Sequence, residues 1–360
     1  MKICIIGDGL VSLTLANVLI KKEILVDILI NRKSNRYDKI RTLGISKSNI
    51  DYFNNKIINI EKNLWKIKNI KILTENSPDK EILDFGNNKK QIFSIIKNYK
   101  LYEILNKNLK KSKFVKFQNF NDYEYVKKKK YKLIINCDFK NEITKKFFSN
   151  NIEKNYHSNA YTTVINHKKI LKNDIAYQNF TDHGPIAFLP VSNTQTSIVY
   201  SFRKKNANSD IDIKDLIKKY NPKYSILKIN DLKCMKLKSS SLRKYYKNNI
   251  LAFGDLLHKI HPLAGQGFNM SIRDIKLLSE LIDQRIKIGL DINSSICKDF
   301  QKKAQDKNYI FSSGVDLIYE LFHFEAKIKS KLLSKSINII GKNKFINSFF
   351  KKFADTGFRV

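Results

Sequence analysis

Hydrophobic and polar positions along the first thirty residues follow two different periods. Residues 2–6 and 24–30 are apolar except for one charged residue each, which predicts two buried strands. Between them, residues 10–21 place apolar side chains at the spacing of a helix face. Two strands joined by one helix of this length predict a βαβ unit.

The pattern changes twice further along the chain. A helix is expected at 98–109 and a buried strand at 131–137. Residues 155–203 alternate in the manner of β-strands, with turn signals between them. Residues 248–283 return to strand, turn and helix, and helices follow from residue 295. This order predicts a sheet domain inserted within a discontinuous α/β domain.

The turn after the first strand is typical of a dinucleotide-binding fingerprint. Gly7 allows the tight turn, and Gly9 allows a pyrophosphate to approach the backbone at a helix N-terminus. Ser12 replaces the third glycine of the fingerprint, and Asn31 replaces the acidic residue that would hold the ribose hydroxyls. An ordinary strand–helix turn is the alternative interpretation of these residues alone.

A second glycine-rich turn lies at residues 254–274. The chain has only 12 Gly and 5 Pro, and Gly254, Pro262, Gly265 and Gly267 all fall within this window. Asp255 can accept hydrogen bonds from ligand hydroxyls. The later glycines let backbone amides approach a ligand edge where the helix dipole favours negative charge. The alternative is a glycine-rich turn that is capped by Asp255.

This second turn resembles the second flavin motif of the FAD-dependent aromatic-ring monooxygenases (group A flavoprotein monooxygenases), and more narrowly that of the ubiquinone-biosynthesis hydroxylase family. The matching residues are Gly254-Asp255, His258, His261-Pro262-Leu263-Ala264-Gly265-Gln266-Gly267-Phe268-Asn269 and Asp274. Three more segments resemble the family in the family's order: Arg41-Thr42-Leu43-Gly44-Ile45-Ser46, residues 95–101, and Gly184-Pro185-Ile186-Ala187-Phe188-Leu189-Pro190. The resemblance extends over residues 1–285, and the rest matches only as helices.

The resemblance implies an α/β fold with a discontinuous, Rossmann-like FAD-binding domain, an inserted β-sheet substrate domain and C-terminal helices. The expected bounds are 1–70, 96–150 and 236–290 for the FAD-binding domain, 71–95 and 151–235 for the β-rich substrate domain, and 291–360 for the C-terminal helical region.

The resemblance also implies which residues bind FAD and substrate. The family's middle flavin motif matches residues 134–142, where Asp138 is retained but Phe139 replaces a glycine, and the motif's serine and arginine are missing. Pro262 and His261 are expected near the flavin ring. The residues expected to bind FAD are Gly7, Gly9, Ser12, Asn31, Arg41, Asp138, Asp255, Pro262, Gly265, Gln266, Gly267, Phe268 and Asn269, and those expected to bind substrate are Gly184, Pro185, Leu189 and Pro190.

By resemblance, the chain is expected to be an FAD-dependent monooxygenase, an oxidoreductase that acts on paired donors with O2. FAD, reduced by NAD(P)H or another donor, would form a flavin hydroperoxide that hydroxylates the aromatic ring of a polyprenylated phenol in ubiquinone biosynthesis. Because the flavin carries the chemistry, no side chain is expected to be catalytic.

Two alternatives stay open. The replacements at Ser12, Asn31 and Phe139 favour a non-catalytic or weakly flavin-binding subunit of a membrane-associated quinone-biosynthesis assembly. A flavin-dependent polyprenyl reductase would share the fold without the oxygen chemistry.

The net charge of +35 adds little to this interpretation. The lysines are spread over the whole length and are not interleaved with aromatic residues, so nucleic-acid binding is not expected. An anionic membrane surface and other ubiquinone-biosynthesis proteins are partners left open. Residues 311–353 predict a basic amphipathic helix, which would pack on a membrane or on its own domain.

A cytoplasmic protein is expected, with peripheral attachment at the inner face of the membrane left open. No apolar run is long enough to cross a bilayer, and the N-terminus lacks the layout of a secretory signal.

No metal site is expected. His258 and His261 lie three residues apart, but no third ligand is apparent and Pro262 disfavours a helix there. His261 is instead expected to form a local hydrogen bond. The cysteines form no CxxC pair, which is typical of a reduced chain; they are Cys4, Cys137, Cys234 and Cys297.

Overall fold

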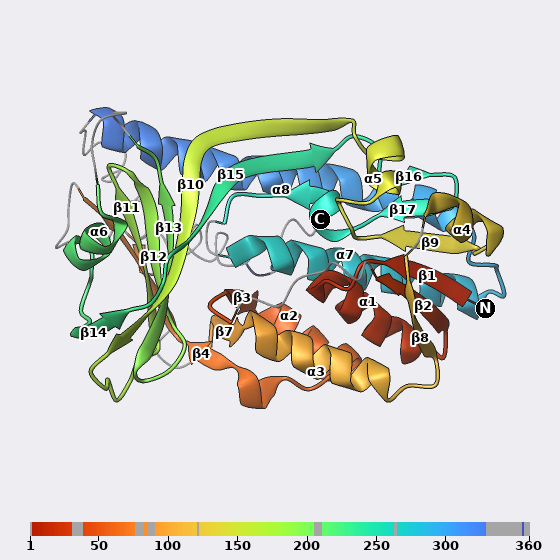
Figure 1. Cartoon of the computed structure of the whole chain (residues 1–360), viewed down its shortest axis with the longest axis horizontal. Helices are drawn as coiled ribbons and strands as arrows, with labels where there is room; N and C mark the ends of the chain where they lie inside the picture. Colours follow the sequence, from red (N-terminus) through yellow and green to blue (C-terminus); the bar gives the residue numbers. More distant parts are fainter. Residues whose placement is uncertain are drawn as a thin grey trace.

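The computed structural model places two sheets at opposite ends of the molecule, with the long helix α8 (Ser295–Ile328) running beside both (Figure 1). The structure describes residues 2–30, 39–75, 83–84, 91–120, 122–204, 211–262, 265–328 and 355.

The six-stranded sheet is assembled from strands that lie far apart in the sequence. Its order is β16-β17-β9-β1-β2-β8, with β16 (Tyr246–Lys247) antiparallel at one edge and the other pairs parallel. The parallel strands are β1 (Lys2–Ile6), β2 (Leu25–Ile30), β8 (Val115–Asn119), β9 (Leu133–Asn136) and β17 (Ile250–Ala252). Because β17 pairs with β9, the expected discontinuous Rossmann-like domain is confirmed.

Helices α1 (Leu10–Ile20), α3 (Asn98–Lys110) and α7 (Gln266–Lys287) share the main hydrophobic core with this sheet. Helix α1 is buried on almost every side, so its polar Asn17 needs partners. The Asn17 amide donates to the Leu13 and Leu105 carbonyls at 2.7 and 3.2 Å and accepts from Asn108 at 2.7 Å. These bonds fix the position of α1 relative to α3.

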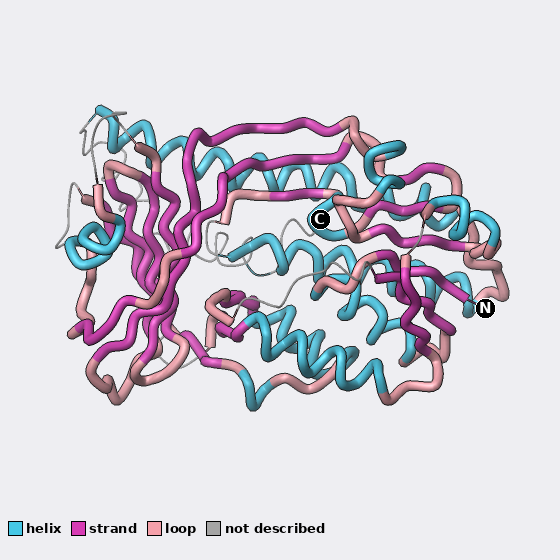
Figure 2. The backbone as a smooth tube through the Cα atoms, in the orientation of Figure 1, coloured by secondary structure: helices cyan, strands magenta, loops and turns pink. Residues whose placement is uncertain are grey.

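The nine-stranded sheet forms the opposite end of the molecule. Its order is β18-β15-β10-β13-β12-β11-β5-β6, with β14 (Ile226–Ile229) paired to β10. The strands are β18 (His258–Lys259), β15 (Lys233–Leu242), β10 (Asn151–His167), β13 (Gln195–Phe202), β12 (Gly184–Pro190), β11 (Ile175–Thr181), β5 (Asn69–Thr74) and β6 (Leu83–Asp84). Helix α6 (Ile213–Lys219) shares a core with this sheet. The 17-residue strand β10 and its partner β15 extend from it toward the six-stranded sheet (Figure 2).

A three-stranded antiparallel sheet connects the two larger ones. It comprises β3 (Thr42–Ser46), β7 (Phe93–Lys97) and β4 (Trp65–Ile67), and β3 leads into helix α2 (Lys47–Tyr52) and a π-helical turn (Phe53–Ile57). The Thr42 hydroxyl donates to the Ser197 hydroxyl at 2.9 Å, and the Lys97 amine donates to Gln195 at 3.0 Å. These bonds tie β3 and β7 to the nine-stranded sheet.

The expected architecture is confirmed, while the exact division into domains stays a prediction. The expected borders fall within β5, β7 and β15, which all pair with neighbouring strands. The short helices α4 (Tyr123–Lys128) and α5 (Glu142–Phe147) flank β9, and 3-10 turns occupy Glu61–Asn63 and Gly254–Leu256. Much of the amphipathic segment expected at 311–353 lies outside the described residues. Within the described ranges, no helix is long and apolar enough to span a membrane.

Candidate functional site

The first glycine turn and the residual middle motif meet at one point. Gly7 ends β1 with a left-handed backbone, at φ +107°. A Cβ placed on Gly7 would lie 3.4 Å from Ser12 Oγ and 3.5 Å from the Asp138 backbone nitrogen and Cβ. Three predicted FAD ligands therefore lie side by side. The Asp138 carboxylate accepts from the Lys140 amide at 2.9 Å, which fixes the turn after β9.

Gly9 leaves open space above the N-terminus of α1. Its φ of −69° suits any residue, and a Cβ added there would meet none of the described residues within 4 Å. Gly9 therefore answers no steric demand of the protein itself. Open space beside the free amides of a helix N-terminus fits a pyrophosphate.

The second glycine turn packs directly on the first. Gly254 has φ +66°, and its added Cβ would lie 3.1 Å from Val11 Cγ1. Asp255 is exposed next to it. Burial, with smaller contributions from the Asp255 and Asp138 carboxylates, raises the pKa of the Cys137 thiol to about 12. Two predicted FAD ligands from distant segments thus lie within electrostatic reach of one half-buried thiol.

Asn269 clamps the turn onto β3. Its amide donates to the Gly44 carbonyl at 2.8 Å and to the Gly265 carbonyl at 3.3 Å. Its Oδ1 accepts from the Ser46 amide at 2.9 Å and from Asn49 at 3.0 Å. Because this buried side chain uses its donors and its acceptor within the protein, it fixes the position of the loop on β3.

Gly265 is the N-cap of α7 and has a left-handed backbone, at φ +65°. This backbone conformation favours glycine, whereas a Cβ added there would lie 3.4 Å from the Gly44 nitrogen, which is an ordinary contact distance. Gln266 and Gly267 begin the helix, half-buried, and the buried Gln266 Oε1 has no hydrogen-bond partner among the described residues. Phe268 packs beneath them against Phe53, with ring centroids 6.3 Å apart.

These residues fit FAD. Helices α1 and α7 both begin at a glycine N-cap, and Gly254, in the turn that precedes α7, packs on Val11 of α1. The open space at Gly9 and the unpaired Gln266 oxygen are features that a polar, extended ligand would use.

His261 differs from its expected role. It is 1% exposed, and neither ring nitrogen has a hydrogen-bond partner in the described part of the chain, so the predicted local hydrogen bond is wrong. The ring instead packs against Tyr156 and Tyr319, with centroids 4.9 and 4.3 Å away. Burial, with a smaller effect of Lys154, lowers the pKa of His261 to about 3. A neutral imidazole therefore lies beside the half-buried Pro262.

This burial predicts a measurable pH dependence of stability. Below its ordinary pKa of 6.5, His261 binds a proton in the unfolded chain but not in the folded chain, so stability falls as pH falls. This residue contributes a slope of about 1.4 kcal/mol per pH unit between pH 6 and pH 4. His261→Phe should remove that slope from the free energy of unfolding, measured by urea titration. Replacing the exposed His157 by Asn should leave it unchanged, and identical slopes in all three proteins would contradict the assignment.

His258 has a structural role that the sequence did not reveal. Its Nε2 lies 2.5 Å from the Asp274 carboxylate, whose other oxygen accepts from Asn308 at 3.0 Å. All three side chains are buried, and they join β18, α7 and α8. No cluster of three metal-ligating side chains occurs in the part of the chain that the structure describes.

The predicted substrate residues lie on β12, between β11 and β13. Leu189 packs with Ile67 and Ile95, so it faces the three-stranded sheet, and Pro190 follows it at the same end. Gly184 and Pro185 lie at the other end of the strand, about 15 Å away at ~3.3 Å per residue. Packing alone explains glycine at position 184, because an added Cβ would lie 2.1 Å from the Ser201 carbonyl oxygen.

Two other residues that were predicted to bind FAD are not brought against the glycine turns by the contacts described above. Asn31 lies outside the described residues. Arg41 is exposed just before β3, and its carbonyl accepts from the Asn98 amide at 3.0 Å. Sequence reasoning missed Asn49 and Tyr156, because their partners lie far away in the sequence.

Comparisons with known proteins also point to FAD binding. A family model described as an FAD binding domain matches residues 137–306. The mitochondrial ubiquinone biosynthesis monooxygenase COQ6 of Schizosaccharomyces pombe is 23% identical over 265 residues, which cover 61% of this chain and 55% of that protein. COQ6 of Dictyostelium discoideum is 24% identical over 424 residues, covering 89% and 84%. The chain spans about half the length of most curated relatives it matches.

Solved structures confirm the fold. p-Nitrophenol 4-monooxygenase PnpA from Pseudomonas putida has a TM-score of 0.76 at 13% identity, covering 99% of this chain and 98% of that one. Klebsiella pneumoniae HpxO complexed with FAD and uric acid has a TM-score of 0.74 at 11% identity, covering 99% and 96%. Together with the family model and the COQ6 relatives, these matches confirm the resemblance that the sequence motifs indicate.

Proposed function

Because this chain resembles the ubiquinone-biosynthesis hydroxylases among the FAD-dependent aromatic-ring monooxygenases, we propose that it is such an enzyme and hydroxylates the aromatic ring of a polyprenylated phenol. The observation that carries the proposal is that Gly254 packs on Val11 of α1, more than 240 residues away, and that each of the two glycine-rich segments leads into a helix N-terminus. When bound, FAD would supply the activation of O2 for insertion of one oxygen atom.

Each end of the site has its own task. The amides after Gly7 and Gly9 would bind the pyrophosphate, and Asp255 would accept hydrogen bonds from the ribityl hydroxyls. The turn from Pro262 to Phe268, held on β3 by Asn269, would place its amides at the flavin edge. A substrate would lie between this turn and the Leu189 end of β12, against the apolar cluster of Ile67 and Ile95. That surface would exclude water from the reacting atoms.

The replaced motif residues would weaken FAD binding, but the strand and helix around them still form. Ser12 is fully buried where the fingerprint has glycine, and β1 and α1 still form around it. Phe139 is 60% exposed at the middle motif, next to the predicted pyrophosphate site. The reductant would be NAD(P)H or another electron donor.

The experiment is flavin loading followed by product analysis. Purified protein should bind FAD, and with a reductant and O2 it should convert a short-chain polyprenylated phenol to a hydroxylated product, identified by mass. Asp255→Ala should lower FAD affinity roughly 10–100-fold, because a hydrogen bond to a charged group contributes about 1.5–3 kcal/mol. Asp283→Ala removes a half-buried carboxylate that pairs with Lys22 near the C-terminal end of α7; as the control, it should bind FAD normally.

The same experiment separates the alternatives. A protein that takes up no FAD would support a non-catalytic subunit, and a product with a saturated side chain and no added oxygen would support a reductase. For location, we propose a cytoplasmic protein that meets its lipid-soluble substrate at an anionic membrane face, to which a chain of charge +35 is attracted.

A further inference from the structure

A cavity of about 170 Å³ lies between α2, α7 and α8, lined on the side of α7 that carries Arg273 and Lys276. The volume of a water molecule in the liquid is about 30 Å³, so this cavity has room for one small ligand. Lys303 and Lys307 of α8 complete a cationic lining, with Ser48 at the α2 end. The acids that line it are Asp274 and Glu280, and Asp274 is already bonded to His258 and Asn308.

Arg273 is the unusual member of this lining. Its guanidinium lies 4.0 Å from the centroid of the Phe311 ring, and its Nη2 is buried with no hydrogen-bond partner within the described ranges. Burial lowers the pKa of Arg273 to about 10, which still leaves it charged at neutral pH. A buried guanidinium with an unused donor is costly unless an anion accepts from it.

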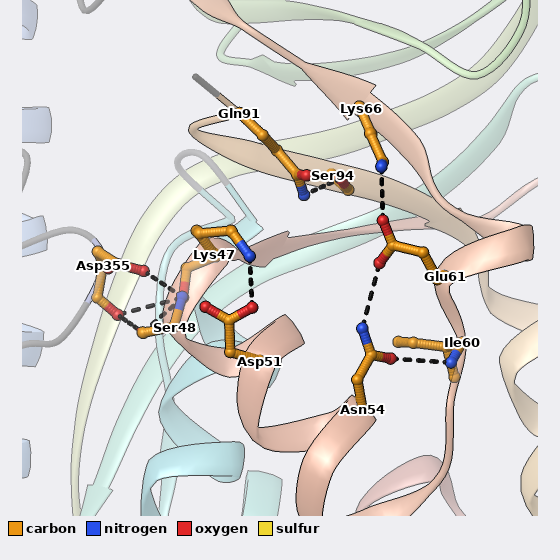
Figure 3. Close-up of polar contacts among 11 residues, drawn as sticks. Lys47, Ser48, Asp51, Asn54, Ile60, Glu61, Lys66, Gln91, Ser94 and Asp355 are labelled. Carbon is orange, nitrogen blue, oxygen red and sulfur yellow. Dashed lines mark hydrogen bonds and ion pairs between the residues drawn. The ribbon is translucent and has the colours of Figure 1, made fainter.

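A carboxylate is already seated at the rim of this cavity. The Asp355 carboxylate accepts from the Ser48 amide at 3.0 Å, and the Asp355 carbonyl accepts from the Ser48 hydroxyl at 3.1 Å (Figure 3). The same carbonyl accepts from the Ser46 hydroxyl at 3.1 Å. Asp274 and, with a smaller effect, Asp355 raise the pKa of Arg273 against the effect of burial, so the Asp355 carboxylate and the guanidinium lie within electrostatic reach. The rim of this cavity thus accommodates a negative charge, and the Asp355 carboxylate supplies that charge from within the chain.

A second cavity shows that lysines alone do not make such a site. It has a volume of about 310 Å³ and is lined by Lys244, Lys247 and Lys298. In a chain with 68 Lys and Arg residues, a lining of this kind is expected by composition. The α2–α7–α8 cavity differs from it by its buried, unpaired arginine nitrogen and by a bound carboxylate.

We propose that the α2–α7–α8 cavity binds a small phosphate-bearing anion through Arg273, Lys303 and Lys307, and that Asp355 competes with this anion as a tethered carboxylate. A doubly charged phosphate matches the four cations of the lining, and the planar guanidinium can donate two parallel bonds to it. This site is separate from the proposed FAD contacts and does not depend on hydroxylation.

Calorimetric titration of the FAD-loaded full chain with inorganic phosphate, at low ionic strength, tests the proposal. Saturable 1:1 binding is expected, weakened at least tenfold by Arg273→Gln and strengthened several-fold by Asp355→Asn. Lys247→Gln, at the other cavity, should change nothing. Equal affinities in the wild type and Arg273→Gln would show adventitious binding and overturn the proposal. Weaker binding by Asp355→Asn would overturn the competing role of Asp355.

Two additions keep the outcome decisive. If Arg273→Gln fails to fold, the double variant Lys303→Gln, Lys307→Gln alters only exposed side chains and should also weaken binding at least tenfold. Repeating the titration with glycerol 3-phosphate distinguishes the source of the phosphate, since tighter binding than inorganic phosphate indicates a phosphomonoester. The flavin spectrum, recorded on the same samples, reports separately whether the proposed function has failed.

Discussion

Gly9→Val is expected to abolish FAD binding while the apoprotein stays folded. FAD affinity should fall by at least about 100-fold, equivalent to about 2.7 kcal/mol, because the side chain would occupy the open space where the pyrophosphate meets the α1 amides. The free energy of unfolding should fall by about 1 kcal/mol or less, because Gly9 has an ordinary backbone conformation and valine is only a poorer N-cap. Flavin absorbance after gel filtration, with urea titration of the apoprotein, measures both.

This variant separates binding from folding because nothing in the described protein lies within 4 Å of the added Cβ. The matched control is Gly289→Ala, at the end of α7, where an added Cβ also meets nothing and no FAD contact is proposed. That control should bind FAD like the wild type. Wild-type affinity in Gly9→Val would show that the pyrophosphate does not lie at this helix, and would remove the main support for the site.

Gly184→Ala is expected to destabilise the whole nine-stranded sheet. Gly184 has φ +123°, which costs an alanine about 1–3 kcal/mol, and its Cβ would lie 2.1 Å from the Ser201 carbonyl oxygen. Forcing β12 and β13 apart costs about 1–3 kcal/mol more. The free energy of unfolding should therefore fall by roughly 2–6 kcal/mol, measured by urea titration.

Gly289→Ala is again the matched control, because Gly289 has φ +69° without any close neighbour. It should cost only about 1–2 kcal/mol, the strain of the left-handed backbone. Equal losses in the two variants would show that β13 moves aside, and that the close approach to Ser201 contributes nothing.

Local periodicity predicted most of the flavin-binding half correctly. Strand β1 was expected at 2–6 and lies there, and the helices expected at 10–21 and 98–109 end within one residue of α1 and α3. Such elements are predictable because the apolar period of a segment follows from its own residues. The glycine turns were predictable for the same reason, since each lies where a strand ends and a helix begins.

The role of individual site residues was less predictable. Asn269 was expected to contact FAD, which stays a prediction; only the structure shows that its side-chain oxygen accepts from the Ser46 amide, 223 residues away. His261 was expected to form a local hydrogen bond, but Tyr156 and Tyr319 enclose it. Both outcomes depend on which distant segments pack together, and no local pattern records that.

The sequence by itself determined the alternation of α/β and β-rich segments, the two glycine turns, and the resemblance to flavin monooxygenases. It did so because strand and helix periods and glycine positions are properties of neighbouring residues. Only the tertiary structure decided that Gly254 packs on Val11, that Asn269 clamps β3, and that the half-buried Arg273 lies within electrostatic reach of Asp355. Those contacts join segments separated by more than eighty residues, and they exist only once the sheets and helices have packed.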